Sequence, residues 1–320
     1  MRPPFYTMQT TVFAALLGLH AVLGIRIATS LQWLEYTPQP YAIDNFYKAD
    51  TAQLVSGGVA NLVSDRNMDL AANAETQGLK AYAQNKNIRL IYIIVEVAYR
   101  LIGNRAAGID SLEDFKGKRV GGIPGTSAGY FVTKLLGTAG LQQSDFRMVS
   151  GNACMKTPCG AGTYPQMMAS GQIDGFGLWE PAVELAAEQL GSNAVIFKNA
   201  SIYRETYSLY STTDKLKDPT SRAKIVQFVR ALNQSVSVFR SQPDKVYSYA
   251  SQKVGMDAAV AKKVWDDHVW GGTGMGAELV DFLNVEDQYL AQQDRRQPAG
   301  RAAMEQFIDT SVLEEAMKLS

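Results

Sequence analysis

The stretch Ser111–Leu141, SLEDFKGKRVGGIPGTSAGYFVTKLLGTAGL, predicts a strand, a turn and a helix in direct succession. Lys118–Ile123 is a short, largely apolar run that a Pro-Gly pair closes, as expected for a buried strand that ends in a turn. Thr126 and Ser127 then stand before a periodic apolar segment. Because both residues are common at helix starts, we expect a helix that begins at this turn.

The start of this expected helix suits an anionic group. The first backbone N–H groups of a helix have no partner inside it and lie at the positive end of its dipole, so they can hold a carboxylate, sulfonate or phosphate. The hydroxyls of Thr126 and Ser127 would add two donors, although the same residues also suit a plain helix cap. A nucleotide is disfavoured, because the stretch forms neither GxGxxG nor GxxxxGK[ST].

Two segments carry a resemblance to a known family. LEDFKGKRVGGIPGTSAGYFV, residues 112–132, resembles the opening of the second lobe in type 2 periplasmic substrate-binding proteins of the SsuA/THI5-like branch. That branch includes binders of aliphatic sulfonates, taurine and nitrate, and the fungal thiamine-pyrimidine synthases. MASGQIDGFGLWEP, Met168–Pro181, is similar to the family's Trp-Glu-Pro segment. With a first-lobe counterpart near Leu62–Ala74, the resemblance spans Ile25 to about Trp270.

The resemblance implies an α/β fold of two lobes, each a mainly parallel sheet flanked by helices, joined by a two-strand hinge. Arg89–Ile102 is a long apolar run rich in β-branched residues, and we expect it to cross between the lobes. The expected return comprises Ala194–Phe197 and Ile202–Tyr210. Two nearby crossings permit the lobes to close on a ligand. Four charged residues should lie near the cleft floor and pair with one another or meet the ligand: Glu96, Arg100, Arg204 and Glu205.

The expected boundaries follow from these crossings. Residues 25–99 and 203–320 would form a discontinuous lobe one, and residues 100–202 would form lobe two. Ser221–Phe239 has apolar residues at helical spacing, so we expect lobe one to include C-terminal helices. Another helix is expected to start near Tyr41.

The N-terminal segment Met1–Gly24 predicts a signal peptide. It begins with a basic residue, contains the almost wholly apolar Val12–Leu23 and has no acidic residue. The apolar run is short for a membrane span, so we expect a secreted or periplasmic protein. A mitochondrial presequence fits less well because positive charges are few, and a misassigned start codon is a further explanation.

Composition excludes several classes of function. The 320 residues include 31 Lys+Arg and 31 Asp+Glu, so no overall charge recruits nucleic acid, and a charged ligand must be recognised locally. The chain contains no HExxH pattern. His268 is the only histidine after residue 24, so general bases are scarce. Its two neighbouring aspartates favour a surface or interface position over a catalytic one.

The two cysteines lie in the segment CMKTPC as Cys154 and Cys159. Four intervening residues exclude CxxC, and no histidine is near, so no metal site is expected. A signal-like N-terminus implies an oxidising compartment, which favours a disulfide between them, whereas an intracellular protein would keep two free thiols.

The ligand site is expected in the cleft, because ligands gather at the carboxyl ends of strands in an open α/β sheet. Trp33 would equally suit a cover over the lobe's own core, and Asn73 would suit a helix cap. Glu180 would repel an anion, so we expect it to meet an amino group of the ligand or an arginine. The expected ligand-binding residues are Gln32, Trp33, Asn73, Thr126, Ser127, Trp179 and Glu180.

The predicted function is that of a monomeric solute-binding protein that closes on a small anionic or zwitterionic ligand, sulfonate-like, nitrate-like or pyrimidine-precursor-like. A bacterial protein would deliver the ligand to an ABC permease. The sequons at Asn199 and Asn233 leave a eukaryotic secreted origin open, in which case the permease is absent. No cofactor is expected.

Two alternatives stay open. One is an enzyme of the thiamine-pyrimidine (HMP-P) synthase class, which uses pyridoxal phosphate on a lysine, sacrifices an active-site histidine and has a cysteine-rich iron-binding motif. The first lobe has no histidine after Gly24, and CMKTPC departs from that motif, so no catalytic residue is assigned. The other is a secreted, non-catalytic relative of the binding fold that acts through protein contacts.

Overall fold

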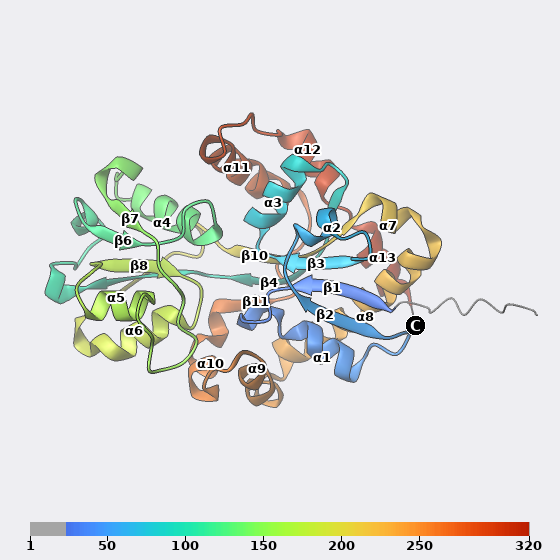
Figure 1. Cartoon of the computed structure of the whole chain (residues 1–320), viewed down its shortest axis with the longest axis horizontal. Coiled ribbons are helices and arrows are strands. Elements are labelled where there is room, and N and C mark those ends of the chain that lie inside the picture. Colours follow the sequence, from blue (N-terminus) through green and yellow to red (C-terminus); the bar gives the residue numbers. More distant parts are fainter. Residues whose placement is uncertain (1–23, 320) are drawn as a thin grey trace, which may run out of the picture.

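The computed structural model describes residues 24–319 of the chain. The expected signal peptide therefore lies outside the described residues except for Gly24. The chain forms two sheets, each with helices on both faces (Figure 1). We call the part built on the six-stranded sheet lobe one and the part built on the five-stranded sheet lobe two. Within residues 24–319, every helix is too short or too polar to span a bilayer.

The sheet of lobe one has the strand order β11-β4-β10-β3-β1-β2. β1 runs parallel to β2 and β3, whereas β10 runs antiparallel to β3 and β4, and β11 runs antiparallel to β4. The strands are β1 (Ile25–Thr29), β2 (Ala52–Ser56), β3 (Leu70–Asn73), β4 (Ile88–Val97), β10 (Glu205–Thr212) and β11 (His268–Trp270).

The sheet of lobe two has the order β7-β6-β8-β5-β9. β6 runs parallel to β7 and β8, and β5 runs antiparallel to β8 and β9. The two-lobe α/β prediction is confirmed, but both sheets are mixed, because the strands that connect the lobes run against their neighbours. The strands are β5 (Arg100–Asn104), β6 (Arg119–Gly121), β7 (Arg147–Val149), β8 (Gly175–Leu178) and β9 (Ala194–Lys198).

Three helices belong to lobe two and ten to lobe one among the described residues (Figure 1). Those of lobe two are α4 (Ser127–Gly137), α5 (Tyr164–Ala169) and α6 (Ala182–Leu190). Those of lobe one are α1 (Pro38–Asn45), α2 (Asn61–Ser64), α3 (Glu75–Gln84), α7 (Thr213–Lys217), α8 (Pro219–Ser241), α9 (Tyr247–Val254), α10 (Ala258–Val264), α11 (Ala277–Gln293), α12 (Arg301–Phe307) and α13 (Ser311–Lys318).

Two helix starts show how local chemistry sets the first residue. α8 has Pro219 in its first turn and buries Ile225, Phe228 and Leu232 on one face, which confirms the predicted helix. α1 begins at Pro38 and not near Tyr41, because a proline suits the first helical position, where its missing N–H costs nothing.

The chain crosses between the lobes twice. β4 of lobe one continues through residues 98–99 into β5 of lobe two, and β9 returns through residues 199–204 into β10 (Figure 1). Both expected crossings are thus present. Nine of the ten residues of β4 are buried, so this strand forms the centre of the core that holds the crossings in place.

The segment around His268 differs from expectation. Its residues form the short strand β11, which pairs with β4, and His268 is only 5% exposed. Its Nδ1 lies 2.9 Å from the carbonyl oxygen of Val264, and burial lowers the pKa of the imidazole to about 4. Of the two expected positions, surface or interface, the surface position is wrong, because strand pairing takes this residue into the interior as a neutral side chain.

Candidate functional site

A cavity of about 140 Å³ lies between the lobes and brings together five of the seven expected ligand-binding residues. They come from both lobes: Trp33 and Asn73 from lobe one, and Thr126, Ser127 and Trp179 from lobe two.

Strand ends position these residues. Asn73 is the last residue of β3, and Trp33 follows four residues after the end of β1. In lobe two, Trp179 directly follows β8, and Ser127 begins the helix that follows β6. Since the carboxyl ends of neighbouring parallel strands meet at one sheet edge, each lobe presents its loops to the same cleft.

Two tryptophan rings meet across the cleft. The ring centroids of Trp33 and Trp179 lie 5.1 Å apart at an interplanar angle of 63°. Tyr99, in the first crossing, places its ring 6.4 Å from that of Trp179. An edge-to-face pair with one ring from each lobe joins the lobes at this point and gives the cavity an aromatic wall.

The start of α4 borders the cavity on the side of lobe two. Gly125 has φ +71°, a left-handed conformation that a glycine adopts without strain, and this turn leads into the helix. Thr126 donates its hydroxyl to the carbonyl oxygen of Ile123 at 2.8 Å and does not cap the helix. Ser127 Oγ lies 3.0 Å from the hydroxyl of Tyr99. The first backbone N–H groups of α4 therefore have no side-chain cap.

Two buried carboxyl groups line the cavity from lobe one: Glu205, which was expected near the cleft floor, and Glu35, which was not expected in the site. Glu35 and Glu205 are 2% and 5% exposed, and the Oε2 atom of each has no hydrogen-bond partner. Burial, with the nearby charge of Glu180, raises the pKa of Glu35 to about 7. Burial and the neighbouring carboxyls Glu35 and Glu75 raise the pKa of Glu205 well above its usual value.

The alternation of side chains along β10 could have placed Glu205 in the cavity. Side chains of a strand alternate between its faces, so Glu205 and Tyr207 share one face and Arg204 and Thr206 share the other. Glu205 and Tyr207 both line the cavity between the lobes. The sequence had placed Glu205 near the cleft floor, where it would pair with another charged residue or meet the ligand.

Two hydrogen-bond donors in the cavity also have no partner. The indole Nε1 of Trp179 and the hydroxyl of Thr76 are both buried and unpaired in the structure, and both residues line the cavity. Thr76 lies in the first turn of α3, so the cavity is bordered by the starts of two helices, α3 and α4. Lysine, arginine and histidine are absent from its described lining residues.

Glu180 lies outside this cavity. Its carboxylate accepts a hydrogen bond from Arg100 at 2.6 Å and another from the backbone N–H of Glu184 at 3.0 Å. Arg100 also bonds Glu184 at 3.0 Å and lies 3.4 Å from Asp267 of lobe one. Of the two partners expected for Glu180, an amino group of the ligand or an arginine, the structure shows the arginine. The exposed Gln32 likewise does not line the cavity.

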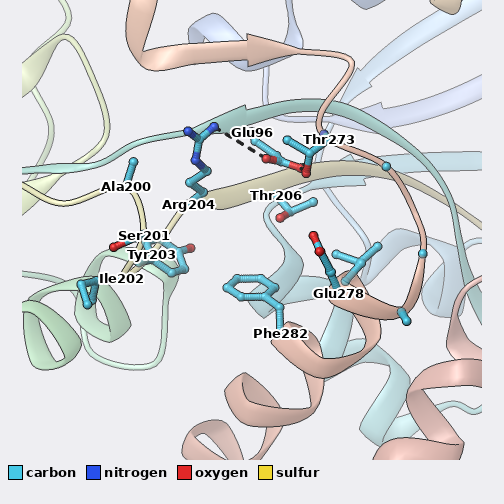
Figure 2. A pocket seen from close by; sticks show the side chains of 14 residues that line it. Glu96, Ala200, Ser201, Ile202, Tyr203, Arg204, Thr206, Thr273, Glu278 and Phe282 are labelled. Carbon is cyan, nitrogen blue, oxygen red and sulfur yellow. Dashed lines mark hydrogen bonds and ion pairs between the residues drawn. The ribbon is translucent and has the colours of Figure 1, made fainter.

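A second cavity of about 330 Å³ lies on the other face of β10 (Figure 2). Figure 2 shows Arg204 beside Glu96, and the distance between their charged groups is 3.9 Å. Glu96 also accepts hydrogen bonds from the backbone N–H and the hydroxyl of Thr273, each at 2.8 Å. Because these polar groups already have protein partners, the smaller cavity is the better candidate for the ligand site.

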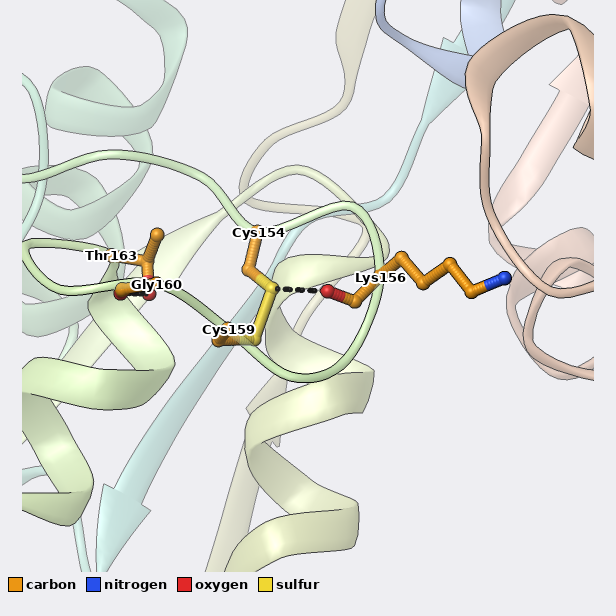
Figure 3. Close-up of a disulfide and its surroundings, with 5 residues drawn as sticks. All are labelled: Cys154, Lys156, Cys159, Gly160 and Thr163. Atoms are coloured by element: carbon orange, nitrogen blue, oxygen red, sulfur yellow. Dashed lines mark hydrogen bonds between the residues drawn. A yellow bond between two sulfur atoms is a disulfide. The ribbon is translucent and has the colours of Figure 1, made fainter.

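The predicted pairing of Cys154 and Cys159 is confirmed (Figure 3). Their Cα atoms are 5.6 Å apart, and Cys154 packs with Leu185 of α6 and Val260 of α10. Figure 3 shows Lys156 extending away from the disulfide, and its ammonium group lies 3.1 Å from Asp257. The disulfide loop of lobe two therefore contacts lobe one. Among residues 24–319, no cluster of histidine, cysteine, aspartate and glutamate is arranged to hold a metal ion.

A family model described as "NMT1/THI5 like" matches residues 53–246, which include most of both sheets. The chain belongs to the NMT1/THI5-like family. A search of curated proteins found no match to this NMT1/THI5-like chain.

Solved structures share the fold of this NMT1/THI5-like protein at low sequence identity. The periplasmic aliphatic sulphonate binding protein SsuA from Escherichia coli has a TM-score of 0.70 and 14% identity, with 90% of this chain and 92% of that chain covered. The alkanesulfonate-binding protein SsuA from Xanthomonas axonopodis pv. citri, bound to MOPS, has a TM-score of 0.66 and 14% identity, with coverages of 90% and 98%. A Candida albicans gene product with the generic periplasmic binding protein fold has a TM-score of 0.62 and 15% identity, with coverages of 90% and 97%.

Proposed function

We propose that this protein is a solute-binding protein that closes its two lobes on a small anionic or zwitterionic molecule. The observation that carries the proposal is the cavity between the lobes, where Trp33 of lobe one meets Trp179 of lobe two. Enclosed sites with aromatic walls and a few unpaired polar groups are typical of small-ligand binding. The sulfonate-binding proteins that share the fold support the same role.

The anionic group of the ligand would lie at the start of α4. Thr126 and Ser127 line the cavity there, and the first N–H groups of the helix lack a side-chain cap. The unpaired Nε1 of Trp179 and the unpaired hydroxyl of Thr76 supply further donors. Neutral donors would thus hold the anion in a cavity whose lining has no basic side chain.

Pyridoxal phosphate does not fit this cavity. The cofactor forms its Schiff base with a lysine, and no lysine stands among the described lining residues. His268, the one histidine after residue 24, is buried against Val264 and outside the cavity. A binding protein therefore agrees with the site better than a synthase.

The lobe boundaries, the location of the protein and its partner belong to the same proposal. We assign residues 25–99 and 203–320 to lobe one and residues 100–202 to lobe two, with the boundaries at the two crossings. The protein would act as a secreted or periplasmic monomer. In a bacterium it would deliver its ligand to an ABC permease, since structural relatives include a ligand-binding component of an ABC-type import system from Staphylococcus aureus.

Ligand binding by matched variants tests the proposed site. Gently purified protein is examined by native mass spectrometry for a retained small molecule, and thermal shift is measured with an alkanesulfonate, nitrate and an aminomethylpyrimidine. Ser127→Leu should abolish the shift by filling the cavity, whereas Ser201→Leu makes the same change in the second cavity and should leave the shift unchanged. Loss of binding in Ser201→Leu alone would move the site to the second cavity. A wild-type protein that retains and binds nothing would contradict the function itself.

A further inference from the structure

The cavity between the lobes contains two buried carboxyl groups, each with one oxygen that lacks a hydrogen-bond partner. Glu205 projects from the first residue of β10, and Glu35 from the short helical turn Leu34–Tyr36 after β1. The Oε2 atom of each is buried and makes no hydrogen bond in the structure. Because an unpaired carboxyl oxygen is costly to bury, two such oxygens in one cavity indicate a complementary group that binds there.

The two arginines expected near the cleft floor are engaged elsewhere. Arg100 bonds Glu180 and Glu184 and lies near Asp267. Arg204 lies on the opposite face of β10, 3.9 Å from Glu96. The described lining of the cavity has two carboxyl groups and no cationic side chain. A cationic group that pairs with these carboxyl groups would therefore come from the ligand.

The walls near these carboxyl groups suit a cation as well. Trp33 and Trp179 line the same cavity, and the faces of tryptophan rings attract ammonium and guanidinium groups. The unpaired donors, Trp179 Nε1 and the Thr76 hydroxyl, suit an acceptor, as does the start of α4. The cavity thus offers acceptors to one end of a ligand and donors to the other.

We propose, on the basis of the proposed function, that the ligand is zwitterionic and that its protonated amine or amidine binds between Glu205 and Glu35, beside the Trp33–Trp179 pair. Its acidic group then lies at Thr126 and Ser127. Glu205 and Glu35 act as specificity-determining residues, because a desamino analogue leaves the Oε2 atom of each buried without a partner.

Proton release on binding follows from this arrangement. Burial raises the pKa values of Glu35 and Glu205, so the free cavity holds protons that a cationic ligand displaces. Affinity for a zwitterion should then rise as the pH passes through about 7, the pKa of Glu35. Other titratable groups near these two carboxyls are Glu75, Glu180, Glu286, Tyr99, Tyr203 and Tyr207.

Matched pairs of small acids test the inference. Taurine is compared with ethanesulfonate, and β-alanine with propanoate, within a wider set of acids in which each amine has its desamino partner. Calorimetry of the full chain should show binding of aminated members, with proton release detected as a dependence of the measured heat on the buffer. Glu205→Gln should weaken this binding by about 10- to 100-fold and reduce the proton release, because a charged hydrogen bond is lost.

Glu278→Gln is the matched control, since it makes the same change at an exposed residue of the second cavity. It should leave binding and proton release unchanged, and circular dichroism establishes that both variants are folded. Tighter binding of desamino acids, or zwitterion affinity that falls with rising pH, would overturn the inference and leave the solute-binding function standing. No binding by any acid, with no retained molecule, would overturn both.

Discussion

Between about pH 4.5 and about pH 7, Glu35 keeps its proton in the folded protein, whereas an exposed glutamate loses it. Burial raises the pKa of its carboxyl group from 4.5 to about 7. The folded state therefore binds this proton more tightly than the unfolded state. The resulting stability is fully present below about pH 4.5 and is lost as the pH rises through about 7.

We predict that the stability of the wild-type protein relative to Glu35→Gln falls by roughly 2–3 kcal/mol between about pH 5 and about pH 8. Urea unfolding of both proteins across this range measures the difference. His268 acts in the opposite direction, because its buried imidazole has a lowered pKa, but it is present in both proteins and cancels. A difference that does not change with pH would show that Glu35 titrates like an exposed carboxyl.

The sequence predicted those cavity residues whose place follows from strand ends alone. Trp33, Asn73, Ser127 and Trp179 follow strand ends, and strand ends in α/β sheets meet at the cleft. Glu35 was not identified, because its burial depends on tertiary packing that no local pattern encodes.

At the scale of elements, the disulfide loop ties a short segment of lobe two to its surroundings. Cys154 and Cys159 are five positions apart, and Cys154 packs with Leu185 and Val260. The sequence predicted the pairing from the compartment and the short spacing. It did not predict that α10, a helix of the other lobe, would contact this loop, because that contact joins residues about a hundred positions apart in the chain.

We predict that replacing both cysteines by serine lowers the free energy of unfolding by less than about 3 kcal/mol, the value for a loop of about fifteen residues, because a shorter loop loses less entropy on closure. Urea unfolding measures the change. Thiol labelling of the unreduced wild-type protein should find no free thiol, and labelling after denaturation and reduction should find two. Two free thiols in freshly isolated, unreduced protein would contradict the pairing.

At the scale of the whole molecule, pairs of aromatic rings join the two lobes. Trp33 and Trp179 meet at the cavity, and Tyr130 of α4 packs against Tyr289 of α11 with ring centroids 4.9 Å apart. The family pattern anticipated two lobes and two crossings. It did not anticipate the mixed sheets, because strand direction follows from the path of the chain between lobes and not from the composition of each strand.

Lys263 provides a contact between the lobes that is remote from the ligand cavity. This residue of α10 pairs with Glu188 and lies 3.5 Å from Glu184, both in α6 of lobe two. Lys262, its neighbour in α10, instead lies over the ring of Tyr247 in lobe one. The two lysines therefore differ in whether they face the other lobe.

We predict that ligand reduces the radius of gyration of the wild-type protein, and that Lys263→Glu shifts the ligand-free protein toward an open form. Like charges on α10 and α6 would then repel, so ligand affinity should fall severalfold at low ionic strength and recover at high salt, because salt screens exposed charges. Small-angle scattering and calorimetry measure both effects.

Lys262→Glu is the matched control and should bind like wild type. Identical wild-type scattering curves with and without saturating ligand would indicate a rigid site, and an unchanged affinity in Lys263→Glu would show that this contact does not contribute to closure.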